Sequence, residues 1–144
     1  MHEFELIGHF FSDGTAKRED VVLGIGDDAA LLRVGTGRAI VTAITTVRDP
    51  MQKQSPEFLG RHALALSLDR LKDKGATPAW ATLALTLHEI DEDWLTRFSH
   101  GMKELARDSG VSLIGGDTTR GPLSITVIAN GLRDSNAALG VCRT

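Results

Sequence analysis

Along the 144 residues, hydrophobic positions recur at helical spacing in some segments and alternate with polar ones in others, which predicts both helices and strands. Apolar residues recur near helical spacing in residues 3–12, and this indicates a short amphipathic helix. After a polar loop, residues 21–34 indicate a strand, a glycine-rich bend that carries two acids, and a second strand. Residues 36–47 are rich in β-branched side chains and are predicted to form another strand.

Two longer helices are marked by signals at both ends. Residues 55–57 supply a hydroxyl cap, a proline at the first helical position and an acid in the first turn, and Gly75 ends this helix. The other helix begins with the acids at 91–93, which suit the positive end of the helix dipole, and ends at Gly110. Its apolar stripe consists of Trp94, Phe98, Met102 and Leu105.

Three further strands are predicted at residues 78–87, 111–116 and 123–130, where apolar side chains alternate with small or polar ones. Together these elements predict an α+β fold, a single mixed β-sheet with the two main helices packed on one face. The open face of such a sheet would carry apolar residues that need a partner. We therefore expect it to be used for dimerisation or to be covered by a second domain.

Composition and charge exclude several function classes. The net charge of −3 and the sequence pI near 5.9 argue against non-specific nucleic-acid binding, which needs a basic surface. The single cysteine, Cys142, cannot form an internal disulfide, so a reducing cytoplasm is expected. The first residues lack a secretory signal, and no apolar run approaches the roughly 20 residues of a membrane span. We expect a cytoplasmic protein with neither nucleic acid nor membrane as a partner.

Two bends in which aspartates follow glycines are the candidate metal- and phosphate-binding sites. The sequence GIGDD (24–28) places Asp27 and Asp28 after two glycines, and GGDTT (115–119) repeats the design with Asp117. Hard carboxylate oxygens suit Mg²⁺, which usually also holds nucleotide phosphates. The alternative for either bend alone is an acidic turn in which Asp and Thr bond their own backbone. Two such bends in one small domain favour a metal-phosphate site. A P-loop motif is absent, and the protein-kinase motifs are absent too.

The chain resembles the thiamine-monophosphate kinase family, within the aminoimidazole ribonucleotide synthetase superfamily. The resemblance rests on GIGDDAALL (24–32), residues 75–87, residues 91–95 and above all LIGGDTTRGPLS (113–124). It implies transfer of the γ-phosphoryl of ATP to thiamine monophosphate, giving thiamine diphosphate, with Mg²⁺ ions that neutralise phosphate charge. It also implies a homodimer formed through this domain.

The resemblance assigns site roles as well. The catalytic residue stays unknown, whereas Gly116 and Asp117 are expected to contact the nucleotide. The expected metal contacts are Asp27, Asp28, Asp117 and Thr42. The family carries a second domain of comparable size, so residues 1–144 are expected to be an N-terminal ATP- and magnesium-binding domain without the C-terminal one.

Four positions depart from the family pattern. Ile44 and Arg70 stand where the resemblance implies metal-binding aspartates, Met51 stands at a substrate-binding histidine, and Val141 stands at a nucleotide-binding arginine. These changes make the net charge of the site more positive by several units. The site should therefore hold Mg²⁺ poorly while still attracting a phosphate. Two hypotheses remain open: the N-terminal domain of an active kinase, and an inactive remnant that folds and dimerises without turnover.

Overall fold

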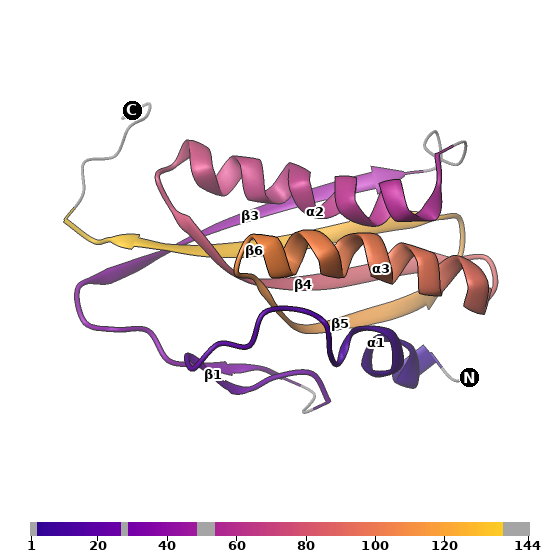
Figure 1. Cartoon of the computed structure of the whole chain (residues 1–144), viewed down its shortest axis with the longest axis horizontal. Coiled ribbons are helices and arrows are strands. Elements are labelled where there is room, and N and C mark those ends of the chain that lie inside the picture. The colour runs from indigo at the N-terminus through magenta and orange to yellow at the C-terminus, as the bar shows by residue number, and fades with distance from the viewer. Residues whose placement is uncertain (1–2, 27–28, 49–53, 137–144) are drawn as a thin grey trace.

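The computed structural model describes residues 3–26, 29–48 and 54–136, with side chains from residue 6 onward (Figure 1). Its elements are, in chain order, α1 (Glu3–Phe11), β1 (Val21–Leu23), β2 (Leu31–Leu32), β3 (Arg38–Arg48), α2 (Pro56–Asp73), β4 (Thr77–Leu87), α3 (Glu92–Asp108), β5 (Ser112–Arg120) and β6 (Ser124–Asp134). None of the helices within these described ranges is long and apolar enough to cross a membrane.

The four long strands form one mixed sheet in the order β3-β6-β4-β5. Strands β4 and β5 are parallel and are joined by α3, whereas β6 pairs antiparallel with both β3 and β4. This confirms the predicted α+β fold with a mixed sheet. The prediction of a single sheet was wrong, because β1 and β2 pair only with each other and form a separate two-stranded sheet.

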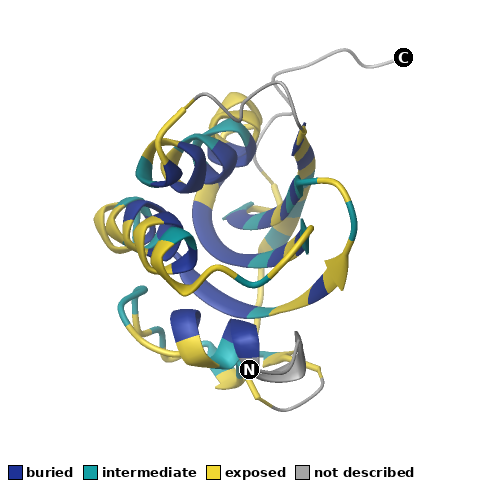
Figure 2. Cartoon of the chain, turned by 90° about the vertical axis from the view of Figure 1, so that its right-hand side faces the viewer, coloured by how far each residue is buried: buried dark blue, intermediate teal, exposed yellow. Residues whose placement is uncertain are grey.

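Helices α2 and α3 lie side by side on one face of the four-stranded sheet, as predicted (Figures 1 and 2). Their apolar stripes and the facing side chains of the sheet form the main core, which buries Leu59, Leu64, Leu68, Phe98, Met102, Leu83, Leu85, Ile125 and Val127. Burial of each such side chain contributes about 1.5–3 kcal/mol. One polar contact crosses this layer: Ser67 Oγ donates to the Val127 carbonyl at 3.0 Å and lies 2.6 Å from Thr45 Oγ1.

The helix ends match the signals in the sequence. The Phe58 amide donates to Ser55 Oγ at 3.1 Å, and the Trp94 amide donates to Asp91 Oδ1 at 3.1 Å. Gly75 and Gly110, which follow the two helices, have φ angles of 72° and 70°. Only glycine adopts this left-handed conformation without a steric cost, so both helices end where predicted.

Two glycines let the backbones of α2 and α3 touch. A Cβ on Gly101 would collide with the Glu57 carbonyl oxygen, and a Cβ on Gly60 would collide with the Phe98 carbonyl oxygen. The two helices can therefore lie this close to each other only if both positions lack a side chain.

We predict that Gly101→Ala lowers the free energy of unfolding by about 1–3 kcal/mol, because the added methyl group must push the two helices apart. The matched control is Gly8→Ala in α1, where an added Cβ meets nothing within 4 Å. There the better helix propensity of alanine should raise stability by up to about 1 kcal/mol. Urea titrations of both variants test this pair. Equal stability changes in the two variants would contradict the close helix contact.

Candidate functional site

The GGDTTR segment is part of a strand, not a bend after one. Strand β5 continues through Ser112–Arg120, and its residues pair with β4 along the whole segment, Asp117 with Ala84 and Thr118 with Leu85. The prediction that a strand ends at residue 116 was therefore wrong. The glycines suggested a break, but the β-branched threonines that follow them favour a strand, and β4 supplies the pairing partners.

Alternation along β5 divides the motif between two faces. Asp117 pairs with Ala84 and points to the same side as its neighbours two residues away, Gly115 and Thr119. Gly116, Thr118 and Arg120 pair with Leu83, Leu85 and Leu87, the first two of which are buried in the main core. The carboxylate and the guanidinium of the motif thus lie on opposite sides of the strand.

The face that carries Asp117 is not covered by α2 or α3, and it is rich in hydroxyl groups. Two cross-strand hydroxyl pairs lie on it, Thr46 with Thr126 at 2.9 Å and Thr86 with Thr119 at 2.8 Å. The large apolar side chains of this face are of two kinds. Ile40, Ile44 and Ile128 are 50%, 56% and 38% exposed, whereas Trp80 and Leu132 are buried in a second cluster that packs against the β1–β2 hairpin. Below, the open face means Ile40, Thr42, Ile44, Thr46, Thr82, Ala84, Thr86, Gly115, Asp117, Thr119, Ser124, Thr126, Ile128 and Asn130.

The structure does not bring Thr42 and Asp117 together. Thr42 lies on β3 and Asp117 on β5, which are the two edges of the sheet, with β6 and β4 between them. Three strand spacings separate these edges by about 14 Å. Because Mg²⁺ binds oxygens at about 2.1 Å, one ion cannot contact both side chains of the same chain. Among the described residues, no three His, Cys, Asp or Glu side chains are grouped as metal ligands.

Four of the predicted or altered positions lie outside the described residues: Asp27, Asp28, Met51 and Val141. The strands on either side of the two aspartates are described. Val21 pairs with Leu32 and Leu23 with Leu31, so the segment that contains both acids connects the two strands of a hairpin.

Gly116 has a packing reason to be glycine. A Cβ at this position would collide with the Leu83 carbonyl oxygen on β4 and would lie 3.3 Å from Ile7 Cδ1 of α1. The contact of α1 with β5 therefore requires a residue without a side chain here. The predicted contact of Gly116 with the nucleotide is independent of this packing and stays a prediction.

The two altered positions Ile44 and Arg70 touch each other. Arg70 lies in the last turn of α2, and its Nη1 donates to the Ile44 carbonyl oxygen at 2.9 Å. Since β3 is an edge strand, this guanidinium satisfies a main-chain acceptor that has no neighbouring strand. A fixed positive charge thus stands beside the residue where the family resemblance implies a metal ligand.

One polar cluster was not predicted. Asp20 accepts from Trp80 Nε1 at 3.0 Å and from Arg18 Nε and Nη2 at 3.0 and 2.9 Å, while Arg18 Nη1 donates to the Gly110 carbonyl at 2.9 Å. The hydrogen bonds from Arg18 lower the pKa of the Asp20 carboxyl, so this group is ionised at neutral pH. The cluster attaches the β1–β2 hairpin to the sheet, because the Asp20 carbonyl also accepts from the Arg33 amide at 2.7 Å.

Comparison with known proteins identifies the family. Residues 26–132 match the family model described as AIR synthase related protein, N-terminal domain, a range that includes β3, the sheet and both main helices. The chain belongs to this family. The resemblance inferred from the sequence motifs is thereby confirmed at the level of the family.

Several of the similar proteins are thiamine-monophosphate kinases. The kinase of Haemophilus influenzae is 40% identical over 146 residues, which cover 99% of this chain and 44% of that protein. The crystal structure of the kinase from Stenotrophomonas maltophilia K279a matches with a TM-score of 0.80 and 41% identity, over 94% of this chain and 44% of that chain. A structure of AaThiL complexed with AMPPCP and TMP shares the fold, with a TM-score of 0.66 and 19% identity over 71% of this chain and 35% of that chain. The chain spans less than half the length of the curated relatives it matches.

We predict that the double variant Ile44→Asp, Arg70→Asp binds Mg²⁺ roughly tenfold more tightly than the parent chain. Opposite charges 4 Å apart attract by about 1 kcal/mol even in water, and the variant both adds carboxylates and removes a repelling cation. The matched control is Ile40→Asp, Lys72→Asp, which makes the same charge change on the same two elements. Calorimetric Mg²⁺ titration compares them. Equal affinities in the two double variants would show that the effect is general charge and not a local site.

Proposed function

We propose that residues 1–144 form the N-terminal, ATP- and magnesium-binding half of a thiamine-monophosphate kinase, which phosphorylates thiamine monophosphate to thiamine diphosphate. The observation that carries this proposal is the joint agreement of sequence and fold with kinases of that name, at 40–41% identity over nearly the whole chain. The AaThiL structure, which holds AMPPCP and TMP, is consistent with a site for a nucleotide and a thiamine phosphate on this fold. The C-terminal half of those relatives would supply the remaining contacts.

The proposed metal site uses hard oxygen donors of the open face and of the hairpin. The Asp117 carboxylate and the Thr42 hydroxyl are both exposed there, and their chemistry suits Mg²⁺. Asp27 and Asp28 would add two carboxylates from the segment between β1 and β2. When bound, Mg²⁺ would neutralise the charge of the ATP phosphates. Arg70 does not fit a metal site, but a guanidinium at this edge can hold a phosphate oxygen directly.

We propose in addition that the open face is a homodimer interface. The proposal is supported by the position of α2 and α3 on the other face of the sheet, which leaves Ile40, Ile44 and Ile128 exposed on this one. A two-fold axis parallel to the strands would place β3 of one copy opposite β5 of the other, across the roughly 10 Å between stacked sheets. Asp117 of one copy would then face the level of Thr46 on β3 of the other, because Asp117, Ala84, Thr126 and Thr46 lie on one register line across the sheet.

We predict that the protein is a dimer at micromolar concentration and that Ile128→Lys converts it into a monomer. Ile128 lies near the centre of the open face, where an interface would bury the added charge without a partner. The matched control is Phe58→Lys on α2, because Phe58 is 42% exposed and Ile128 is 38% exposed. Sedimentation velocity should show a dimer for this control. A wild-type monomer would contradict the proposed interface.

A second candidate function is an inactive domain that folds and dimerises without turnover. The hydrogen bond from Arg70 to the Ile44 carbonyl favours it, because it holds a cation where an active site would need one more carboxylate. The two candidates differ in whether the chain gives kinase activity once the C-terminal half of a relative is joined to it.

We therefore predict the activity of a chimera in which residues 1–144 replace the matching part of the Haemophilus influenzae kinase. The chimera should form thiamine diphosphate, Asp117→Asn should abolish this activity, and residues 1–144 alone should form none. The isolated chain cannot hold the acceptor, and loss of this positioning can cost about 7–11 kcal/mol of barrier. Product is measured directly, with folding of each protein checked by circular dichroism.

Three results distinguish the candidates. Turnover by the unchanged chimera supports the kinase half. Turnover only after Ile44→Asp and Arg70→Asp supports the inactive domain. No turnover from either folded chimera would contradict the proposed function.

A further inference from the structure

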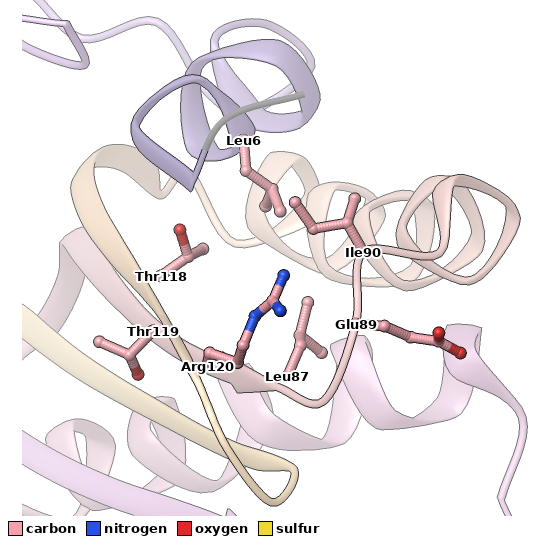
Figure 3. Close-up of a pocket in the computed structure, with 7 residues that line it drawn as sticks. All are labelled: Leu6, Leu87, Glu89, Ile90, Thr118, Thr119 and Arg120. Atoms are coloured by element: carbon pink, nitrogen blue, oxygen red, sulfur yellow. The ribbon is translucent and has the colours of Figure 1, made fainter.

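The second half of the GGDTTR motif contributes to a pocket on the other side of β5 from Asp117. The pocket lies between α1, the segment that follows β4 and the end of β5 (Figure 3). It is lined by Leu6, Leu87, Glu89, Ile90, Thr118, Thr119 and Arg120. The Gly121 amide donates to the Leu87 carbonyl oxygen at 2.9 Å, which holds two of these segments together.

The size of the pocket limits what it can bind. It is a shallow recess that is open to solvent and has enclosed room for about one water molecule. It therefore cannot enclose a drug-sized ligand, and an anion would place one oxygen in the recess while the rest of the molecule lies at its mouth. Leu6 is fully buried and forms an apolar wall, which keeps water away from one side of any bound group.

The charge inside the pocket comes from one side chain. Figure 3 shows the Arg120 guanidinium between Leu6, Leu87 and Ile90, whereas the Glu89 carboxylate points away from it. Among the side chains that the structure describes, which begin at residue 6, no carboxylate forms an ion pair with Arg120. Its planar set of N–H donors is suited to two parallel hydrogen bonds with the oxygens of a carboxylate or phosphate.

We propose that this pocket is a second anion site, which binds a phosphate or carboxylate group through Arg120. Arg120 is exposed to solvent, and the apolar side chains of Leu6, Leu87 and Ile90 shield only the side of the guanidinium that faces them. The site is separate from the open face, because Arg120 and Asp117 project from opposite sides of the same strand. It therefore does not depend on the proposed kinase function.

The test is a titration of the ¹⁵N-labelled chain with inorganic phosphate, and separately with acetate, at constant ionic strength. Amide shifts of residues 118–120 and of Ile90 should saturate with phosphate, and saturation with acetate would extend the site to carboxylates. Arg120→Gln should weaken binding about tenfold or more, because it removes the charge and the paired N–H donors that would hold the anion. Arg120→Lys, which keeps the charge but not the planar donors, should give an intermediate affinity.

Two control variants make the test specific. Arg38→Gln removes an exposed arginine at the start of β3 and should leave the phosphate affinity unchanged. Arg61→Gln on α2 should also leave it unchanged, because Arg61 forms an ion pair with Glu104 and does not line the pocket. Linear shifts without saturation, or equal losses in Arg38→Gln and Arg120→Gln, would overturn the proposal.

Discussion

Alternation of side chains along β3, β6, β4 and β5 gives the sheet two faces of different chemistry, and the other features of the molecule depend on this alternation. One face packs leucine, isoleucine and valine side chains against α2 and α3. The other presents hydroxyls, three isoleucines and Asp117 to the outside. A shift of one residue in the register of β5 would exchange these sets, placing Asp117 in the core and Thr118 outside.

The positions of charge on the two edges follow from the strand order. Asp117 is a carboxylate on β5, whereas Arg70 is a cation held against β3, and β6 and β4 keep the two about 14 Å apart within one chain. Under the proposed function, the β5 edge would bind metal and the β3 edge would bind phosphate, and the two opposite charges do not neutralise each other. Joining them requires either a second copy or a ligand that reaches across the face.

The sequence predicted those parts of the fold that depend on local chemistry. Ser55 and Asp91 caps, the left-handed glycines at 75 and 110 and the apolar stripe of α3 all lie where expected, because each is determined by a few neighbouring residues. The extent of β5 was misjudged, because its glycines are tolerated only through pairing with β4.

Features that depend on distant parts of the chain could not be predicted. The bond between Asp20 and Trp80 joins residues 60 positions apart, and neither lies in a recognisable motif. In the same way, Thr42 and Asp117 were both expected at a metal site, but the order of the strands decides that they occupy opposite edges. Local patterns identify chemically suitable residues, whereas the strand order determines which of them meet.

We propose that two copies meet through the open face, with β3 of one copy opposite β5 of the other. An isotope-filtered NOE experiment on a mixture of methyl-labelled and unlabelled chains measures contacts between copies directly. Contact through this face should give intermolecular NOEs from the methyl groups of Ile40, Ile44 and Ile128, all of which are exposed on it. Intermolecular NOEs confined to the outer surfaces of α2 and α3, or none at micromolar to millimolar concentration, would contradict it.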